Sequence, residues 1–280
     1  MKKGTQYLAV ALLLAATPSC TQSQVHPSKQ VYADAEGWPV TTPADIDFSD
    51  SFQPFRAVWS REYRNMDGEA RQDRVVLVAE ELSWYGRPVI SLTLHDAGAL
   101  ESPDTNARTT SVYVDRQTLS LVRATAPKSG TAEDYNVVAA REDGIVLTTV
   151  STTTGETESK RFATAGPVFG GFNMDFLIWA GLGLQPDSRV LIHRYSPSQN
   201  AMAPDIVRVI DRESIELPNG ERADAWVVER PISQPDNALV QHFRILDRAP
   251  YIASRHVIDL DSKETRSHFT LLEWELLGSD

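Results

Sequence analysis

The chain has 280 residues, of which 41% are hydrophobic and 23% charged, a composition that is typical of a folded globular protein and excludes collagen-like and disordered chains. Its net charge of −11 provides no basic surface for nucleic acid, so we expect no nucleic-acid partner. The single cysteine, Cys20, excludes an intrachain disulfide framework and a zinc cluster held by thiolates.

Residues 1–19 have the pattern of a secretory signal peptide. Lys2 and Lys3 precede a nearly apolar run over 7–16, and small or turn-forming residues follow it. The run is too short to cross a bilayer as a helix. Removal of the segment takes away two lysines and no acid, so the mature chain is more acidic and is not drawn to anionic lipid by charge.

Cys20 directly follows this segment, and the arrangement resembles a bacterial lipoprotein signal. The resemblance implies cleavage before Cys20, a diacylglycerol on its thiol and an acylated N-terminus, which together anchor a protein stably. Thr17 and Pro18 depart from the family's pattern, which favours leucine at the first of these positions. The alternative is cleavage by the general signal peptidase, which leaves Cys20 as a free thiol or removes it. Thr21 stands where the family uses aspartate to retain proteins in the inner membrane, so the resemblance implies a periplasm-facing, outer-membrane-anchored protein.

Residues 20–54 are predicted to form a lipid-anchored tether ahead of a single β-rich domain over 55–280. The stretch is rich in Pro, Ser, Thr and Gln, as flexible tethers are. The aromatic residues Trp38, Phe48, Phe52 and Phe55 indicate that its later part lies against the domain.

From residue 55 onward the sequence predicts a mainly β fold. Short runs rich in Val, Ile, Thr and aromatic residues recur between Gly, Pro, Asn and Asp residues. About a dozen strands at this spacing predict a large antiparallel curved sheet, either a half-barrel or a barrel-like meander. Tight turns are expected at Asp143-Gly144, Thr154-Gly155 and Asn219-Gly220. The expected strands cover 55–64, 73–82, 90–94, 109–115, 119–125, 135–140, 145–150, 157–163, 188–195, 205–217, 222–230, 239–247, 250–260 and 265–277.

The strand-rich body contains a faint internal repeat. A strand, an Asp-Arg turn and a second strand occur around Asp115-Arg116 and again around Asp247-Arg248. The two halves, about 55–165 and 188–280, are therefore either related meanders of one sheet or hairpins that only look alike.

The segment 166–184 differs from its surroundings because it is almost entirely apolar. We expect a short buried helix, capped by Asn173 and ended by Gly181 and Gly183, that packs in the core or plugs the open face of the sheet. A membrane span is disfavoured by the glycines and by the polar residues within the segment.

These elements resemble those of a family of uncharacterised bacterial envelope proteins with β-rich bodies. The resemblance lies in Tyr85-Gly86-Arg87-Pro88 before a strand, the two Asp-Arg units, the central apolar helix and the run over 217–226. The chain is more distantly similar, over about 55–277, to the half-barrels of lipoprotein-carrier proteins. That likeness implies a curved sheet wrapped around helices that can hold acyl chains, and it supplies no catalytic residue.

The sequence supports a binding role more than a catalytic one. It contains no nucleophile elbow, phosphate-binding loop, dinucleotide motif or zinc-protease motif, so we expect no enzymatic activity, no cofactor and no metal site. We predict an envelope lipoprotein that binds a lipid, another apolar ligand or an unidentified envelope partner. The apolar cavity for such a ligand is predicted from Phe172, Phe176, Trp179, Trp226 and Trp274, although these residues equally suit an ordinary core.

Two alternative functions remain open at this point. His242, His256 and His268 lie on consecutive predicted strands, so an envelope hydrolase could use His256 or His268 with an acid. Ordinary strand histidines explain the same pattern. The other alternative is a structural assembly protein whose sheet edge pairs with a partner strand.

Overall fold

The computed structural model describes residues 35, 37–48, 52–64, 68–97, 108–128, 134–171, 175–196, 201–233 and 238–278. In these ranges the chain forms one 16-stranded sheet and two short helices. The elements are β1 (Val40–Thr41), η1 (Pro43–Asp45), β2 (Phe55–Arg64), β3 (Ala70–Trp84), β4 (Arg87–Ala97), β5 (Arg108–Asp115), β6 (Leu121–Pro127), β7 (Tyr135–Arg141), β8 (Gly144–Val150), β9 (Thr157–Ala163), β10 (Phe169–Gly170), α2 (Asp175–Gly181), β11 (Arg189–Ser196), β12 (Ala201–Glu216), β13 (Arg222–Ser233), β14 (Ala238–Leu246), β15 (Ile252–Asp259) and β16 (Thr265–Leu276).

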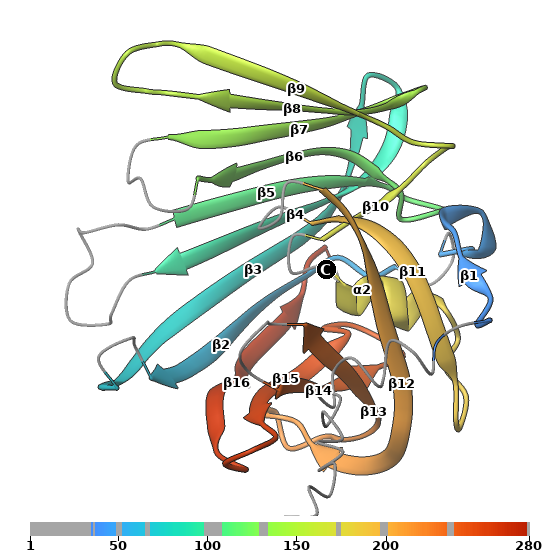
Figure 1. The fold of residues 1–280 in the computed structure, drawn as a ribbon. Coiled ribbons are helices and arrows are strands. Elements are labelled where there is room, and N and C mark those ends of the chain that lie inside the picture. Colours follow the sequence, from blue (N-terminus) through green and yellow to red (C-terminus); the bar gives the residue numbers. More distant parts are fainter. Residues whose placement is uncertain are drawn as a thin grey trace, which may run out of the picture.

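The sheet consists of two sequential antiparallel meanders joined along one seam. The strands β2 to β9 follow one another in space as in sequence, and so do β11 to β16. The seam lies between β16 and β2, where Leu276 pairs with Phe55 and Ser267 with Tyr63. The sheet curls around α2 without closing, because β9 and β1 end the strand order (Figure 1). The predicted fold class, a large curved antiparallel sheet with a short central helix, is confirmed.

All fourteen predicted strands are present, with ends that differ by a few residues. The sequence missed β1 and β10, which have two residues each and run parallel to β11. The predicted turns also form, joining β7 to β8, β8 to β9 and β12 to β13. Gly144 is required in the first of these, because a Cβ there would lie 2.2 Å from the carbonyl oxygen of Phe162.

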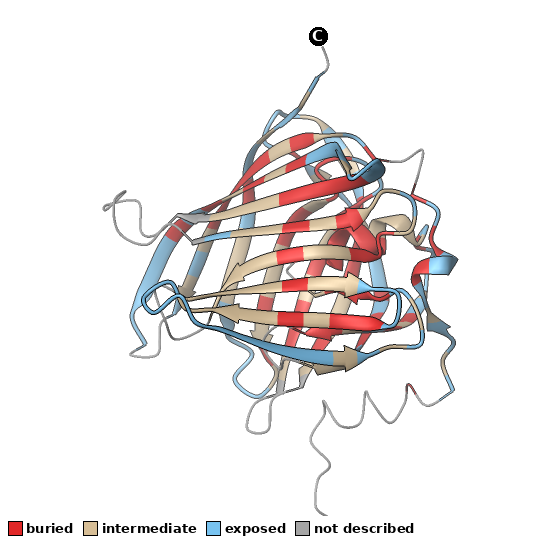
Figure 2. Ribbon diagram, turned by 90° about the horizontal axis from the view of Figure 1, so that it is seen from above, coloured by how far each residue is buried: buried red, intermediate tan, exposed pale blue. Residues whose placement is uncertain are grey.

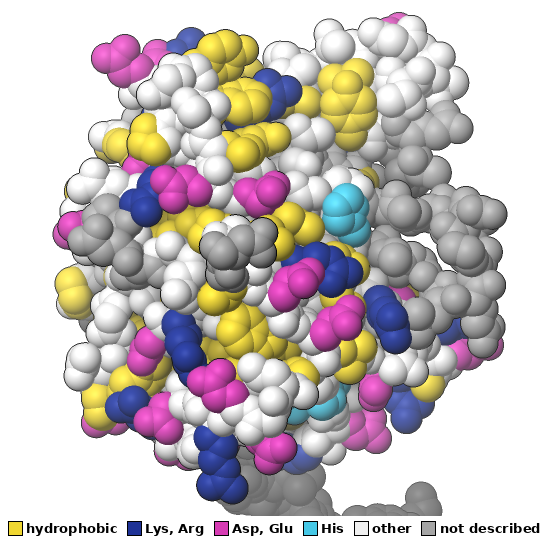
Figure 3. All heavy atoms as spheres, turned by 180° about the vertical axis from the view of Figure 1, so that it is seen from behind, with side chains coloured by type: hydrophobic (Ala, Val, Ile, Leu, Met, Phe, Trp, Pro, Cys, Tyr) yellow, Lys and Arg dark blue, Asp and Glu magenta, His cyan; other side chains and the backbone are white. Residues whose placement is uncertain are grey.

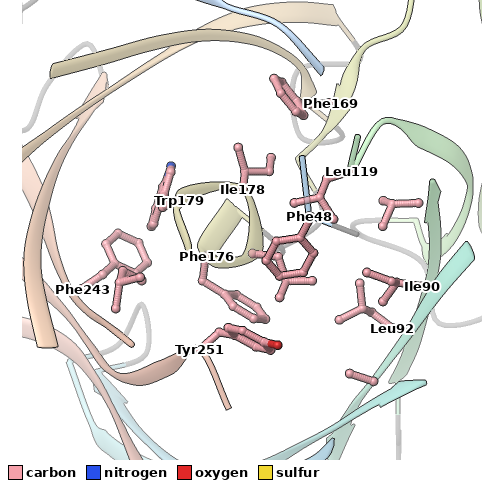
Figure 4. Close-up of a cluster of buried hydrophobic side chains, with 14 of the residues drawn as sticks. Phe48, Ile90, Leu92, Leu119, Phe169, Phe176, Ile178, Trp179, Phe243 and Tyr251 are labelled. Atoms are coloured by element: carbon pink, nitrogen blue, oxygen red, sulfur yellow. The ribbon is translucent and has the colours of Figure 1, made fainter. Parts of the chain in front are cut away.

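The core lies inside the curved sheet and around α2. Figure 2 shows the buried segments in the middle of neighbouring strands, with exposed segments at the hairpins. Figure 4 shows α2 end-on within the sheet, with Trp179 and Phe243 on one side and Phe48 and Leu119 on the other. Trp179 is fully buried, and its ring lies 4.5 Å from that of Phe243 in an edge-on arrangement. The helix α2 therefore occupies the interior of the curved sheet, as the apolar composition of its segment predicts.

The stretch before β2 packs onto the body, as its aromatic residues predict. Phe48 and Phe52 are buried and contact the ring of Tyr251, which precedes β15. The backbone N–H of Gln53 donates to the Tyr251 hydroxyl at 2.8 Å. Burial raises the pKa of Tyr251 to about 12. These contacts fix the start of β2, and with it one side of the seam.

The helix α2 has seven residues and ends at Gly181. Asn173, its predicted cap, lies outside the described residues. Within the described ranges, no helix has both the length and the apolar character that crossing a bilayer would need.

The outer surface carries charges of both signs. On the face shown in Figure 3, acidic and basic side chains are interspersed with hydrophobic ones and do not form a patch of one sign. Many of these charges are paired across neighbouring strands, as Arg208 is with Glu229 and Arg212 with Asp224. Another set of ion pairs, between Arg194, Arg230, Asp175 and Asp205, is buried inside the sheet.

Candidate functional site

A cavity of about 160 Å³ lies on the concave side of the sheet, beside α2. An engineered apolar cavity of roughly 150 Å³ accommodates benzene, so this space takes a small group or one end of a longer ligand. Strands from both sides of the β2–β16 seam contribute to its wall, together with α2. The lining residues are Trp59, Arg61, Val75, Leu77, Leu94, Asp175, Phe176, Arg230, Phe243, Ile252, Ser254, Arg255 and Phe269.

Most of this wall is apolar because strand alternation directs every second side chain inward. Trp59 on β2 pairs in register with Val75 on β3, and Leu77 on β3 pairs with Leu94 on β4. Paired residues share a face of the sheet, so these four side chains form a continuous apolar surface. Phe176 faces the cavity from α2.

A buried network of four charges adjoins the apolar wall. Asp205 accepts hydrogen bonds from Arg194 Nε at 2.9 Å and from Arg230 Nε at 2.6 Å. Arg230 Nη1 also donates to Asp175 Oδ2 at 2.9 Å. Each of the four side chains is at most 14% exposed. Burial raises the pKa of Asp205, and the guanidinium groups of Arg230 and Arg194 oppose that rise. Two cations and two anions leave the network with no net charge.

A glycine makes room for this network. A Cβ at Gly171, directly after β10, would lie 1.7 Å from Nη1 of Arg194 and 2.7 Å from the carbonyl oxygen of Tyr195. Since the second neighbour is backbone, a larger residue at this position would have to displace the strand or the guanidinium.

A separate ion pair balances the charge of Arg61. Its Nε donates to Asp73 Oδ1 at 2.7 Å, and its Nη2 contacts the second oxygen of the same carboxylate. The Asp73 side chain is only 4% exposed. The guanidinium of Arg61 therefore contacts both oxygens of a carboxylate that is almost completely shielded from water.

Arg255 is the cavity cation without such a partner. It lies on β15 between Phe243 on β14 and Phe269 on β16, and its guanidinium carbon is 4.0 Å from the Phe269 ring centroid. Its Nε is buried and has no hydrogen-bond partner among the described residues. Burial, followed by the charges of Arg230 and Arg61, lowers the pKa of Arg255 to about 10. The side chain is therefore still charged at neutral pH.

The predicted cavity residues occupy different places. Phe176 lines the cavity, whereas Trp179 packs in the core beside it. Trp226 lines a second hollow with Arg212, whose guanidinium carbon is 4.7 Å from the ring centroid. Trp274 is partly buried against the core and does not line the cavity beside α2. Phe172 and Cys20 lie outside the described residues.

Sequence reasoning missed the inward-facing charges. Arg255 shares a face of the sheet with Phe243 and Phe269, with which it pairs in register. Arg61 lies two residues after the inward-facing Trp59. A charged residue at an inward position of a predicted strand is the signal that could have identified them.

The three strand histidines meet on the outer face. His242 pairs in register with His256, which pairs with His268. The rings of His256 and His268 are 4.0 Å apart, and His242 Nε2 lies 3.0 Å from Glu229 Oε2. Arg244 donates to His256 Nε2 at 3.0 Å. Desolvation, the charge of His268 and that of Arg244 lower the pKa of His256 to about 4. A histidine held neutral in this way has lost the pKa that suits acid–base catalysis near pH 7.

We expect acid to destabilise the protein through His256. Its pKa is about 4 in the folded chain and 6.5 as the ordinary value, so between these pH values the unfolded chain binds more protons and stability falls as the pH falls. Because the ring is partly exposed, solvent screening limits the loss to about 1 kcal/mol. Urea unfolding at pH 7 and pH 4.5 measures it. His256→Gln should show a smaller difference between the two pH values, and an unchanged difference would contradict the assignment.

Within the described ranges, no group of three or more His, Cys, Asp or Glu residues is placed to hold a metal ion. His256 and His268 lie close together, and His242 contacts Glu229 separately, so these residues do not converge on one point as metal ligands do.

Comparison with known proteins leaves the family unassigned. No protein-family model and no curated protein matches the chain. Among solved structures, a beta-barrel-like protein of domain of unknown function DUF1849 from Brucella abortus shares 10% identity with a TM-score of 0.44, over 81% of this chain and 98% of that one. A provisionally named lipoprotein from Parabacteroides distasonis shares 12% identity with a TM-score of 0.28, over 82% and 99%. A DUF1329 family protein from Desulfovibrio piger shares 8% with a TM-score of 0.26, over 91% and 95%. Values this low support neither a shared family nor a shared function.

Proposed function

We propose that this protein is a non-enzymatic lipoprotein of the bacterial envelope that binds an apolar ligand inside its curved sheet. The observation that carries the proposal is the cavity beside α2, whose wall combines a continuous apolar surface with a few buried charged groups. Ligand sites in proteins commonly have this composition.

The envelope location rests on the N-terminal sequence. A basic start, a short apolar run and Cys20 support export followed by acylation of the cysteine. The acyl chains would hold the protein at the outer membrane, since its acidic charge gives no attraction to anionic lipid. The body would then face the periplasm at the end of the tether.

The other surfaces offer less to a specific function. The outer histidines include a neutral His256 that accepts a hydrogen bond from Arg244. The sheet edge at β9 carries Glu158, Lys160 and Arg161, and charged edge strands disfavour pairing with another strand. A hydrolase or a strand-pairing assembly protein therefore has weaker support than a binding protein.

The proposal is tested on the full chain purified from bacterial membranes in a mild detergent. Native mass spectrometry is expected to show acyl groups on a chain that begins at Cys20, and a co-purified amphiphile in addition. An unmodified Cys20 would refute the anchor. Absence of any co-purified ligand, together with no binding of 1-decanol by calorimetry, would refute the ligand-binding function.

Filling the cavity provides a direct prediction. Leu94→Trp adds bulk to the cavity wall, and we expect it to weaken 1-decanol binding at least about ten-fold, because the ligand and the indole need the same space. The matched control is Leu82→Trp on the outer face of β3, where the leucine is 43% exposed and lies outside the cavity. Equal affinities in the two variants would place the ligand elsewhere.

A further inference from the structure

Among the described residues that line the cavity, together with their ion-pair partners, the cations outnumber the anions by one. Arg194 and Arg230 are balanced by Asp175 and Asp205, and Arg61 is balanced by Asp73. Among the described residues that line the cavity, this leaves Arg255 without a carboxylate of its own, although the charge of Asp175, which Arg230 already binds, also acts on it.

An unpaired cation in such a place is costly to the folded protein. Burial removes water from a guanidinium, and in proteins the loss is normally compensated by an anion or by hydrogen bonds to most of its donors. The contact of Arg255 with the Phe269 ring compensates part of the loss and leaves the buried Nε–H without an acceptor among the described residues. Charged groups that burial perturbs in this way are concentrated at binding and catalytic sites.

We propose that Arg255 binds the anionic head of an amphiphilic ligand whose apolar part lies along the cavity wall, and that this head carries a single negative charge, as the carboxylate of a fatty acid does. A carboxylate accepts two parallel hydrogen bonds from a guanidinium and cancels the excess charge. A doubly charged head would leave one negative charge uncompensated in the same space. The inference rests on the proposed ligand-binding function and specifies the class of ligand.

The position of Arg255 suits this role. Its neighbours across the strands are Phe243 and Phe269, and Ile252 lies on the same strand and lines the same cavity. A head group on the guanidinium therefore places the first carbons of an acyl chain against aromatic and aliphatic side chains. Arg230 and Arg61 also contribute positive potential to the cavity, although each is already paired with aspartate.

The test compares decanoate, 1-decanol and decyl phosphate by isothermal titration calorimetry at pH 8 on the full chain. The variants are Arg255→Met, which removes the charge while keeping an unbranched side chain, and Arg255→Lys, which keeps the charge. The matched control is Arg212→Met, since Arg212 also stacks on an aromatic ring but lies outside the cavity. Thermal unfolding of each unliganded variant is measured in parallel.

In the parent protein we expect decanoate to bind more tightly than decyl phosphate, which carries two charges at this pH. In Arg255→Met, decanoate should weaken by about ten-fold or more relative to 1-decanol, while Arg212→Met keeps most of the decanoate affinity. Arg255→Lys keeps the charge but loses the pair of parallel donors, so its decanoate affinity should lie between those of Arg255→Met and the parent. The unliganded Arg255→Met variant should be at least as stable as the parent, because it no longer buries an unpaired cation.

The outcomes separate the two proposals. If neither decanoate nor 1-decanol binds the parent protein, the ligand-binding function itself fails. If both bind and Arg255→Met leaves their affinity ratio unchanged, the function stands and the role of Arg255 is wrong. A large loss of stability in unliganded Arg255→Met would assign the guanidinium a structural role, and tighter binding of decyl phosphate would overturn the preference for a single charge.

Discussion

Replacing Asp205 with asparagine is expected to destabilise the protein by about 3–5 kcal/mol, the range typical of removing one partner from a buried ion pair. Asp205 bridges Arg194 and Arg230, and its side chain is only 4% exposed. Asparagine keeps the shape and one acceptor oxygen but removes the negative charge, which leaves two guanidinium groups facing Asp175 alone. The free energy of unfolding in urea measures the effect.

Asp224→Asn is the matched control for this substitution. It also removes an acid that pairs with an arginine, but the side chains of Asp224 and Arg212 are 58% and 49% exposed. Water screens such a pair, so we expect a change of at most about 0.5 kcal/mol. Similar losses in both variants would show that the charges inside the sheet are better solvated than their burial indicates.

Shortening Trp179 to alanine is expected to cost about 3–5 kcal/mol, as large-to-small changes in cores do. Trp179 is the side chain through which α2 meets β14, where its ring packs edge-on against Phe243. Its removal leaves a void next to the cavity beside α2, so α2 should also hold Phe176 less firmly. Thermal and urea unfolding measure the loss of stability.

Trp179→Phe separates packing from hydrogen bonding. The indole Nε1 of Trp179 is buried and has no hydrogen-bond partner among the described residues. Phenylalanine therefore removes ring volume without breaking a hydrogen bond, and we expect a loss of about 1 kcal/mol. A loss as large as that of Trp179→Ala would indicate that the N–H group makes a contact essential to the helix.

The fold could be predicted from the sequence because its signals are local. Alternation of apolar and polar residues marks each strand, and turns such as Asn219-Gly220 need only short-range chemistry. The two-residue strands β1 and β10 could not be predicted, since pairs this short take their extended form from contact with β11 and not from their own residues.

The candidate site was predictable only in part. The apolar character of the segment around α2 pointed to Phe176, which does line the cavity. The polar side of the cavity depends on residues brought together across the sheet, such as Arg61 on β2, Arg230 on β13 and Arg255 on β15. A single sequence shows that each arginine lies on a strand. Which carboxylate each one pairs with depends on the strand order and register, and these cannot be read from the sequence.

The seam between β2 and β16 determines when the protein can finish folding. Every other pair of neighbouring long strands is close in the sequence, whereas this one joins residue 55 to residue 276. Until β16 has emerged and docked, β2 and β15 each present an unpaired edge, and the cavity lacks one of its walls. Contacts of such long range slow folding, and exposed edges invite strand exchange between molecules. A newly made chain is therefore most exposed to aggregation until its last strand has docked.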